Sequence, residues 1–254
     1  MINLIPAAGL GIRFSREGYK TPKPLLDVAG EPMIIRACET MPKPDSWIFI
    51  LRKEHVDNFN IDKKLIKKFP KSKFIVIAYN TEGQLSSCLL AKDFINADEE
   101  LFIGSCDSGL IYNLKDFKKV RKKFDVIPFT FTKQKTLANN PNAWGWVKKD
   151  NEARIIGTSI KVPVSDNPFY DFALTGAFYF KTGKLFLELA DAIIKNNIKI
   201  NNEFYVDSLV QAALDKNYLV KDFVVNKYIS WGNPKDYEEF NFWFEVFSKW
   251  KIKK

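Results

Sequence analysis

The sequence predicts an α/β fold in which a mostly parallel, mixed sheet has helices on both faces. Short apolar runs alternate with helix-like segments through the first half of the 254-residue chain. Each run is almost continuously apolar, which is typical of parallel strands that are buried on both sides. No repeat, low-complexity tract or Ser/Gly linker interrupts the chain, so we expect a single domain over residues 1–254.

The first half of the chain has a regular rhythm of strands and helices. The first apolar run ends at Gly9, and Pro32 suits the first turn of the helix that follows. Each later run is bounded by polar residues and followed by a helical pattern. The predicted strands are 2–7, 47–51, 73–79, 101–104 and 125–132, and the predicted helices are 32–41, 62–69, 82–96 and 114–124.

The second half is less regular. Residues 143–149 and 153–161 read as two strands joined by a polar turn, and the aromatic-rich run 172–180 reads as another strand. Further predicted elements are helices 183–195 and 205–216, a strand at 218–225 and a final helix at 234–250. In that helix aromatic residues recur at helical spacing, which predicts packing onto the core; the alternative is a contact between two copies. They are Phe240, Trp243, Phe244, Phe247 and Trp250.

The counts of histidine and cysteine exclude several kinds of site. A zinc site needs about four nitrogen or sulfur ligands, and the chain has one histidine, His55, and three widely spaced cysteines. The odd cysteine number argues against a disulfide framework. No apolar run approaches the roughly 20 residues that cross a bilayer, and the uncharged start lacks the basic residues of a signal peptide. We therefore expect a cytoplasmic protein without a membrane partner.

The net charge of +9 comes mostly from lysine clusters on helix-like stretches. A solvated surface explains most of them. Nucleic acid is not an expected partner, because acidic residues separate the clusters and no aromatic-plus-basic RNA motif is present. An anionic small-molecule substrate remains open, since it needs only a few of these charges.

A glycine-rich turn follows the first predicted strand and contains Gly9 and Gly11. Such turns at the carboxyl end of a first strand bind phosphates in open α/β sheets, because glycine lets backbone N–H groups approach the anion. The third glycine of a dinucleotide fingerprint is missing, and no Gly-Lys-Ser/Thr of a Walker A loop follows. Arg13 stands two residues after Gly11, and Pro22-Lys23-Pro24-Leu25 follows.

This ordered string resembles the nucleotidyltransferase family that activates sugar phosphates and related compounds. The matching motifs are G-x-G-x-R at residues 9–13, P-K-P-L at 22–25 and G-x-P-M-I at 30–34. An accidental glycine turn would explain the glycines but not the arginine and lysine at these offsets. The resemblance implies a Rossmann-like sheet of the nucleotide-diphospho-sugar transferase type, with a nucleotide-binding half at 1–135 and an acceptor-binding half at 136–254.

The resemblance also implies catalytic and nucleotide-binding residues. Arg13 would neutralise the leaving pyrophosphate, and Lys23 would contact the reacting phosphates, as fixed cations suit a triphosphate. The backbone of Ala8, Gly9 and Gly11 would hold the β- and γ-phosphates.

Two further segments follow predicted strands. Gly83 and Gln84 would lie against the nucleotide base, although a helix start capped by Thr81 explains that segment equally well. Asp107 would bind Mg²⁺, which Mn²⁺ can replace, because Mg²⁺ takes one or two carboxylates together with phosphates. A capping aspartate in a turn is the alternative for Asp107, and Cys106 beside it is expected to be small and buried.

The resemblance is looser on the acceptor side. Trp144, Gly145 and Gly176 match strands that face the acceptor, and Lys161 would hold the acceptor phosphate, although Ile160 replaces the family glutamate before it. Glu203 is a candidate acceptor contact, and a helix start capped by Asn202 is the alternative.

A second metal ligand is also in question. Ser230 stands where sugar-1-phosphate members place a second metal aspartate. The second ligand would then be absent or supplied by Asp207 or Asp236.

The short chain and altered acceptor side resemble cytidylyltransferases of bacterial capsule synthesis. This implies CTP, or another NTP, and a small phosphorylated acceptor such as L-glutamine phosphate in phosphoramidate synthesis. Within the family, a sugar-1-phosphate cytidylyl- or uridylyltransferase is the alternative. Two alternatives lie outside the family. A GT-A-like glycosyltransferase would not use Arg13 and Lys23. A non-catalytic nucleotide-binding regulator would not need Asp107.

Overall fold

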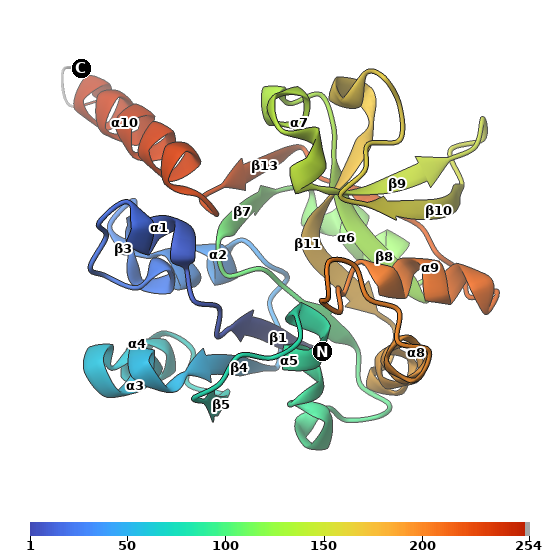
Figure 1. Ribbon diagram of the computed structural model, residues 1–254, viewed down its shortest axis with the longest axis horizontal. Helices are drawn as coiled ribbons and strands as arrows, with labels where there is room; N and C mark the ends of the chain where they lie inside the picture. The colour runs from blue at the N-terminus through green and yellow to red at the C-terminus, as the bar shows by residue number, and fades with distance from the viewer. Residues whose placement is uncertain (252–254) are drawn as a thin grey trace.

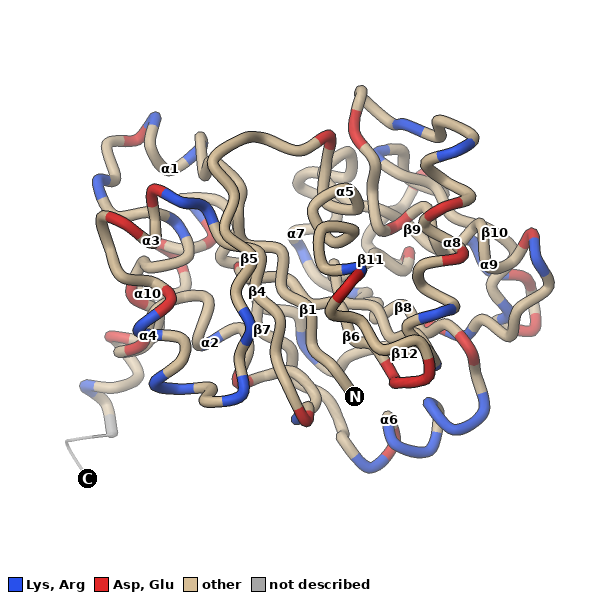
Figure 2. Tube along the Cα trace, turned by 90° about the horizontal axis from the view of Figure 1, so that it is seen from below, with Lys and Arg blue, Asp and Glu red and all other residues tan. Residues whose placement is uncertain are grey.

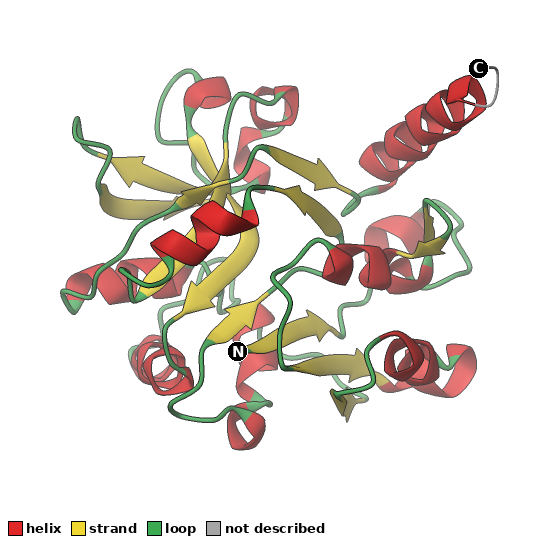
Figure 3. Ribbon diagram, turned by 180° about the vertical axis from the view of Figure 1, so that it is seen from behind, coloured by secondary structure: helices red, strands yellow, loops and turns green. Residues whose placement is uncertain are grey.

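The computed structural model describes residues 1–251, and in these a nine-stranded mixed sheet forms the centre of the molecule (Figure 1). Its main path runs β10-β9-β11-β6-β1-β4-β5, with β8 beside β11 and β12 beside β8. Helices lie on both sides of it (Figure 3). The predicted α/β class, with a mostly parallel, mixed sheet, is confirmed.

The first half of the chain builds the parallel part of the sheet. β1 (Ile2–Ala7) lies between β4 (Ser46–Arg52) and β6 (Leu101–Ile103), and β5 (Ser72–Ile77) pairs with β4; all three pairings are parallel. The carboxyl ends of these strands therefore meet at one edge, which is where open α/β sheets bind ligands.

The second half adds antiparallel strands. β11 (Phe172–Phe180) pairs with β6, β8 (Val126–Phe131) and β9 (Gly145–Lys149), and β9 pairs with β10 (Ile155–Ile160). The expected strand at 218–225 is wrong in extent. Only β12 (Phe223–Val224) and an isolated bridge at Val220 pair with β8.

Two apolar clusters hold the helices against the sheet, one cluster on each face. Along β4, Trp47, Phe49 and Leu51 belong to one cluster and Ile48 and Ile50 to the other, as alternation in a strand requires. Burial of each such large side chain contributes about 2 kcal/mol, so covering both faces is the main source of stability. The helices described are α2 (Met33–Glu39), α3 (Lys53–Phe59), α4 (Ile61–Lys68), α5 (Gln84–Leu89), α6 (Leu114–Val120), α8 (Gly183–Lys195) and α9 (Ser208–Asp215).

Several predicted helices begin later or end earlier in the structure. The helix expected at 82–96 is α5 followed by a short 3-10 turn at Lys92–Phe94. The helix expected at 205–216 begins only at Ser208; Val206 and Asp207 form a turn before it, and the Phe204 N–H is bonded to the Glu82 carbonyl.

Some short elements were not predicted at all. α1 (Ile12–Arg16) follows the glycine turn, α7 (Lys135–Asn139) follows β8, and β2 (Asp27–Val28) pairs with β3 (Glu31–Pro32). A separate two-stranded sheet forms from β7 (Ser108–Ile111) and β13 (Lys227–Ser230). Each of these elements is too short to show a hydrophobic period in the sequence. The partners β7 and β13 are also far apart along the chain.

The final helix, α10 (Pro234–Lys251), extends away from the body of the molecule (Figure 1). The prediction that its aromatic residues pack onto the core is wrong for most of them. Tyr237 is buried and Phe240 packs on Trp231, whereas the aromatic residues that follow are exposed.

Charged residues are spread over the chain. Lysines and arginines lie on several elements with acidic residues between them, and a run of basic residues, Arg121, Lys122 and Lys123, follows α6 (Figure 2). No helix in residues 1–251 is long and apolar enough to cross a membrane.

Candidate active site

The glycine turn leads from the carboxyl end of β1 into α1. Gly11 has a positive φ of 63°, which glycine adopts without strain, and a Cβ at this position would lie 3.3 Å from the Cβ of Lys23. The turn therefore packs directly on the lysine of the P-K-P-L motif. Arg13 is exposed in α1, and within residues 1–251 its guanidinium has no hydrogen bond or ion pair.

Lys23 and Asp107 meet across the site although 84 positions separate them in the sequence. The Lys23 Nζ donates to the Asp107 Oδ2 at 2.7 Å, and the Ser105 hydroxyl donates to Asp107 Oδ1. Both side chains are mostly buried, at 19% and 24% exposed. Pro24, in the 3-10 turn Lys23–Leu25, fixes the backbone directly after the lysine.

The electrostatics keep both groups of this pair ionised. Burial alone favours the uncharged lysine, but the Asp107 carboxylate more than offsets it and raises the pKa of Lys23. Burial likewise opposes ionisation of Asp107, yet the charge of Lys23, the Ser105 hydroxyl and the charge of Arg13 lower its pKa. The influence of Arg13 on both pKa values shows that its charge is felt at this pair.

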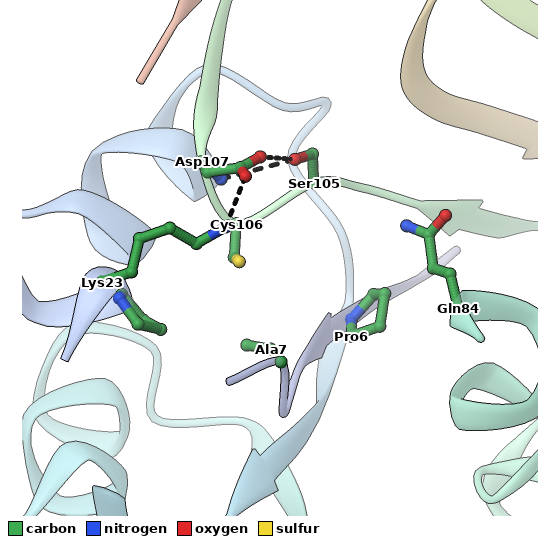
Figure 4. Close-up of a pocket in the computed structure, with 9 residues that line it drawn as sticks. Pro6, Ala7, Lys23, Gln84, Ser105, Cys106 and Asp107 are labelled. Carbon is green, nitrogen blue, oxygen red and sulfur yellow. Dashed lines mark hydrogen bonds and ion pairs between the residues drawn. The ribbon is translucent and has the colours of Figure 1, made fainter. Parts of the chain in front are cut away.

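A pocket of about 220 Å³ opens beside the pair (Figure 4). It lies at the carboxyl edge of β1 and β6, and four residues predicted from the sequence line it together: Gly9, Lys23, Gln84 and Asp107. Cys106 is buried, as expected, and also lines the pocket, where burial raises the pKa of its thiol to about 11. The other lining residues are Pro6, Ala7, Pro24 and Ser105.

Arg52 is a residue that the sequence reasoning missed. From the end of β4 its Nη1 donates to the Ala8 carbonyl oxygen at 3.3 Å and to the Asn80 Oδ1 at 3.0 Å. Its side chain is 14% exposed. One guanidinium thus ties the glycine turn to the segment that begins at Asn80. Its position directly after an apolar strand was the available signal.

Substitution of Arg52 by alanine is expected to raise the KM for the nucleotide by about tenfold with a smaller change in kcat. Hydrogen bonds from a charged donor contribute about 1.5–3 kcal/mol, and here they hold the turn that would meet the phosphates. Steady-state kinetics test this, with Lys53→Ala as the control because Lys53 is exposed and pairs only with Asp57. An unchanged KM would remove the positioning role.

Close backbone packing explains why residue 83 is a glycine. Its φ is 109°, and a Cβ there would lie 2.6 Å from the Phe204 carbonyl oxygen. The Leu85 N–H in the first turn of α5 donates to the same oxygen at 3.0 Å, and the Phe204 N–H donates to the Glu82 carbonyl at 2.7 Å, so this turn is bonded to the chain after Asn202. Gly83 was predicted to let the base approach, and in the structure it permits this close packing. Gln84 beside it faces the pocket (Figure 4).

The predicted acceptor residues form a second group, around β9. The Lys161 Nζ donates to the Ala143 carbonyl at 2.7 Å and lies 5.9 Å from the Tyr205 ring centroid. A Cβ at Gly145 would collide with the Asp207 carboxylate, which therefore lies flat against this glycine. None of these residues lines the 220 Å³ pocket.

The remaining acceptor candidates lie in different surroundings. Gly176, with a φ of 80°, adjoins Ser105, as a Cβ there would be 3.6 Å from the Ser105 Cβ. It therefore links β11 to the pocket. Trp144 packs edge-on against Phe131, and the exposed Glu203 accepts the Tyr205 hydroxyl at 2.8 Å.

Asp207 is a carboxyl group whose ionisation is opposed by burial. Burial raises its pKa to about 6, and the nearby charge of Lys161 only partly opposes this shift. The unfolded chain ionises this group near pH 4, so between about pH 4 and 6 the folded protein holds a proton that the unfolded chain has lost. The contribution of Asp207 to stability therefore falls as pH rises through that window.

Asp207→Asn is accordingly expected to raise the melting temperature at neutral pH and to change it little at pH ~2.5, where the carboxyl is protonated in both states. Thermal unfolding at the two pH values measures the difference. Asp215→Asn, an exposed position at the end of the same helix, should show no such pH-dependent gain. A gain from Asp207→Asn that is equal at both pH values would contradict the account.

The two candidate second metal ligands differ from Asp107 in their surroundings. Asp207 lies against Gly145, and Asp236 accepts from Asn233 in the first turn of α10. Ser230 pairs with Ser108 across β13 and β7. In residues 1–251 no group of three or more His, Cys, Asp or Glu side chains is arranged to hold a metal. Asp107 is therefore the one carboxylate that lines the pocket.

A family model described as nucleotidyl transferase matches residues 2–245, which is nearly the whole chain. The chain belongs to the nucleotidyl transferase family. The motifs at residues 9–13 and 22–25, the pocket and the parallel strands that carry them all fall within the matched region. A search among curated proteins found no match.

Solved structures share the fold at low sequence identity. The nucleoside-diphosphate-sugar pyrophosphorylase of Vibrio cholerae RC9 matches with a TM-score of 0.75 at 20% identity, covering 94% of this chain and 99% of that one. The inositol-1-phosphate CTP transferase of T. maritima matches at 0.70 and 14% identity, covering 92% and 90%. HddC of Yersinia pseudotuberculosis matches at 0.67 and 18% identity, covering 97% and 99%.

Proposed function

We propose that the protein is a Mg²⁺-dependent cytidylyltransferase that joins CTP to a small phosphorylated acceptor and releases pyrophosphate. The observation that carries the proposal is the convergence of Gly9, Lys23, Gln84 and Asp107 on one pocket at the carboxyl edge of the parallel strands. Backbone N–H groups, a cation, an amide and a carboxylate are the groups that a triphosphate, its base and a divalent ion require.

In the proposed reaction an oxygen of the acceptor phosphate attacks the α-phosphorus of CTP, and the bond from that phosphorus to the β-phosphate bridging oxygen breaks. The acceptor phosphate has a second pKa near 6, so it is a dianion at neutral pH and needs no general base. This agrees with a chain that has a single histidine, His55, with its pKa lowered by burial. Arg13 and Lys23 are proposed to neutralise charge on the leaving and transferring phosphates.

The residues of the pocket fit a magnesium ion. Asp107 offers two carboxylate oxygens at the strand end, and each already has a partner, the Lys23 ammonium or the Ser105 hydroxyl. A carboxylate that holds a buried ammonium can also accept a metal cation. Bound there with the phosphates, Mg²⁺ would stabilise charge that develops at the α-phosphate.

The acceptor is proposed to be an amino-acid phosphate, such as L-glutamine phosphate. It carries an ammonium group as well as a phosphate. Lys161 would pair with the acceptor phosphate, and the carboxylates of Glu203 and Asp207 would pair with its ammonium group. Ser230 in place of a second metal aspartate argues against the sugar-1-phosphate alternative. The family resemblance in the acceptor motifs supports this choice, and CTP follows from the same resemblance.

Release of pyrophosphate from a matrix of nucleotides and acceptors tests the proposal. CTP with L-glutamine phosphate and Mg²⁺ is expected to exceed UTP, ATP, GTP or any sugar 1-phosphate by about 100-fold or more, as sites with matched polar partners discriminate strongly. A preference for a sugar 1-phosphate would replace the acceptor but keep the reaction. Absence of pyrophosphate with every pair would refute nucleotidyl transfer, and UDP release from nucleotide sugars would favour a glycosyltransferase.

A further inference from the structure

The second half of α10 carries an aromatic stripe, defined as Trp243, Phe244, Phe247 and Trp250. Spacings of three and four residues place the four rings on one helix face. Their side chains are 48%, 46%, 51% and 68% exposed in that order. Isolated exposed apolar residues are ordinary, but a continuous aromatic face marks an interaction surface.

The stripe continues a line of rings that begins in the core. Phe240 packs on Trp231 with centroids 5.5 Å apart and stacks on Phe244 at 6.2 Å. Phe247 then stacks with Trp243 at 5.8 Å and with Trp250 at 6.3 Å. The rings therefore form two packed groups, one that starts at Trp231 and one at the end of the helix, along an α10 that leaves the body (Figure 1).

The position of the stripe separates it from the nucleotidyl-transfer site. The family match ends at residue 245, whereas Phe247 and Trp250 lie beyond it. No residue of α10 lines the pocket at Asp107. The stripe therefore straddles the end of the family match and lies apart from the pocket.

From these observations we infer that the aromatic stripe is the contact between two copies of this chain, with the two α10 helices antiparallel. A pair centred on residue 245 sets Trp243 of each copy beside Phe247 of the other, and sets Trp250 of each at the level of Phe240 of the other. Such a contact is self-complementary, as a two-fold dimer requires.

The charges of the helix favour the antiparallel arrangement. Its first turns contain Asp236, Glu238 and Glu239 against a single lysine, Lys235. The end of α10 is basic, with Lys249 and Lys251 on either side of Trp250. Antiparallel pairing brings the acidic start of each helix beside the basic end of the other, and it also opposes the two helix dipoles.

The area of the stripe suits a modest dimer interface. At about 200 Å² for an aromatic side chain, the exposed half of the four rings supplies roughly 400 Å² per copy. Both copies together would bury roughly 800 Å² on these rings alone, and flanking side chains bring the total toward the ~1,000–1,200 Å² of specific interfaces.

The same charges disfavour a lipid surface as the occupant. Helices that lie on anionic membranes have polar faces rich in lysine and arginine. Over residues 234–254 five lysines stand against four carboxylates, so the sequence of this segment carries a formal charge of only +1 and is not strongly basic.

Sedimentation of the full chain tests the inference. The wild type is expected to sediment with twice the 29.3 kDa mass of one chain, and Phe247→Glu/Trp250→Glu with that of one chain, its dissociation constant raised at least about 100-fold by two buried charges per copy. Leu219→Glu is the control. Leu219 is a large apolar side chain outside α10 and is 57% exposed, so this variant should remain dimeric.

Circular dichroism melts confirm that each variant is folded, and the single variant Phe247→Arg repeats the test independently. A wild type with the mass of one chain at every concentration would overturn the inference. So would a double variant that stays dimeric, or a single-chain wild type that co-sediments with lipid vesicles. None of these readouts depends on nucleotidyl transfer.

Discussion

Asp107→Asn is expected to lower the turnover for pyrophosphate release by about 1,000-fold or more while the protein stays folded. The substitution keeps the shape of the side chain and removes the one carboxylate of the pocket. Loss of a group that stabilises charge in a transition state costs about 3–4 kcal/mol or more. Both side chains of the ion pair with Lys23 are mostly buried, so its loss should cost about 3 kcal/mol of stability, which thermal unfolding would measure.

Two related variants make the result specific. Asp236→Asn alters a carboxylate that is engaged in the first turn of α10 and is expected to retain turnover within about tenfold, as its loss removes one capping interaction. The turnover of Asp207→Asn shows whether a second carboxylate takes part in metal binding. Binding of Mn²⁺ in the presence of CTP gives a readout apart from turnover. Full turnover or unchanged Mn²⁺ affinity in Asp107→Asn would remove the metal assignment.

Arg13→Ala is expected to lower kcat by about 100- to 1,000-fold with an unchanged melting temperature. The guanidinium is exposed and makes no hydrogen bond or ion pair within the described chain, so folding does not depend on it. Its charge nevertheless lowers the pKa of Asp107, which places it within reach of charges in the pocket. A cation that meets a leaving phosphate contributes on this scale.

Arg16 provides the control for Arg13, since both are exposed arginines of α1. Arg16→Ala should retain kcat, which separates a specific role from the loss of general positive charge. Product inhibition adds a second readout, because Arg13→Ala should bind pyrophosphate at least about tenfold more weakly. Equal losses in the two variants would show that Arg13 acts only through net charge.

Much of the fold could be predicted because buried parallel strands have a strong signature. The runs at β1, β4, β5 and β6 are apolar on both faces, and each was expected close to its observed place. The short pair β7 and β13 was not predicted, because neither strand is long enough to show a hydrophobic period. Their pairing also joins residues more than 100 positions apart in the sequence. The aromatic stripe of α10 was misjudged because helical spacing indicates a face but not what covers it.

The nucleotide side of the site was predictable for a different reason. Gly9, Gln84 and Asp107 follow β1, β5 and β6, and parallel topology brings those strand ends together, while Lys23 belongs to the motif after α1. Arg52 belongs to no motif, and its contacts with Ala8 and Asn80 exist only in three dimensions. The same holds for Ser105, whose bond to Asp107 no spacing rule would have indicated.

The central claim is that the acceptor phosphate attacks the α-phosphorus of the nucleotide. An acceptor whose phosphate oxygens are ¹⁸O tests it most directly when the products are analysed by mass spectrometry. The account predicts that the cytidine diphosphate product retains every labelled oxygen, one of them as the bridge between its two phosphorus atoms, and that the pyrophosphate is unlabelled. Label in the pyrophosphate, or product formed without pyrophosphate, would contradict it.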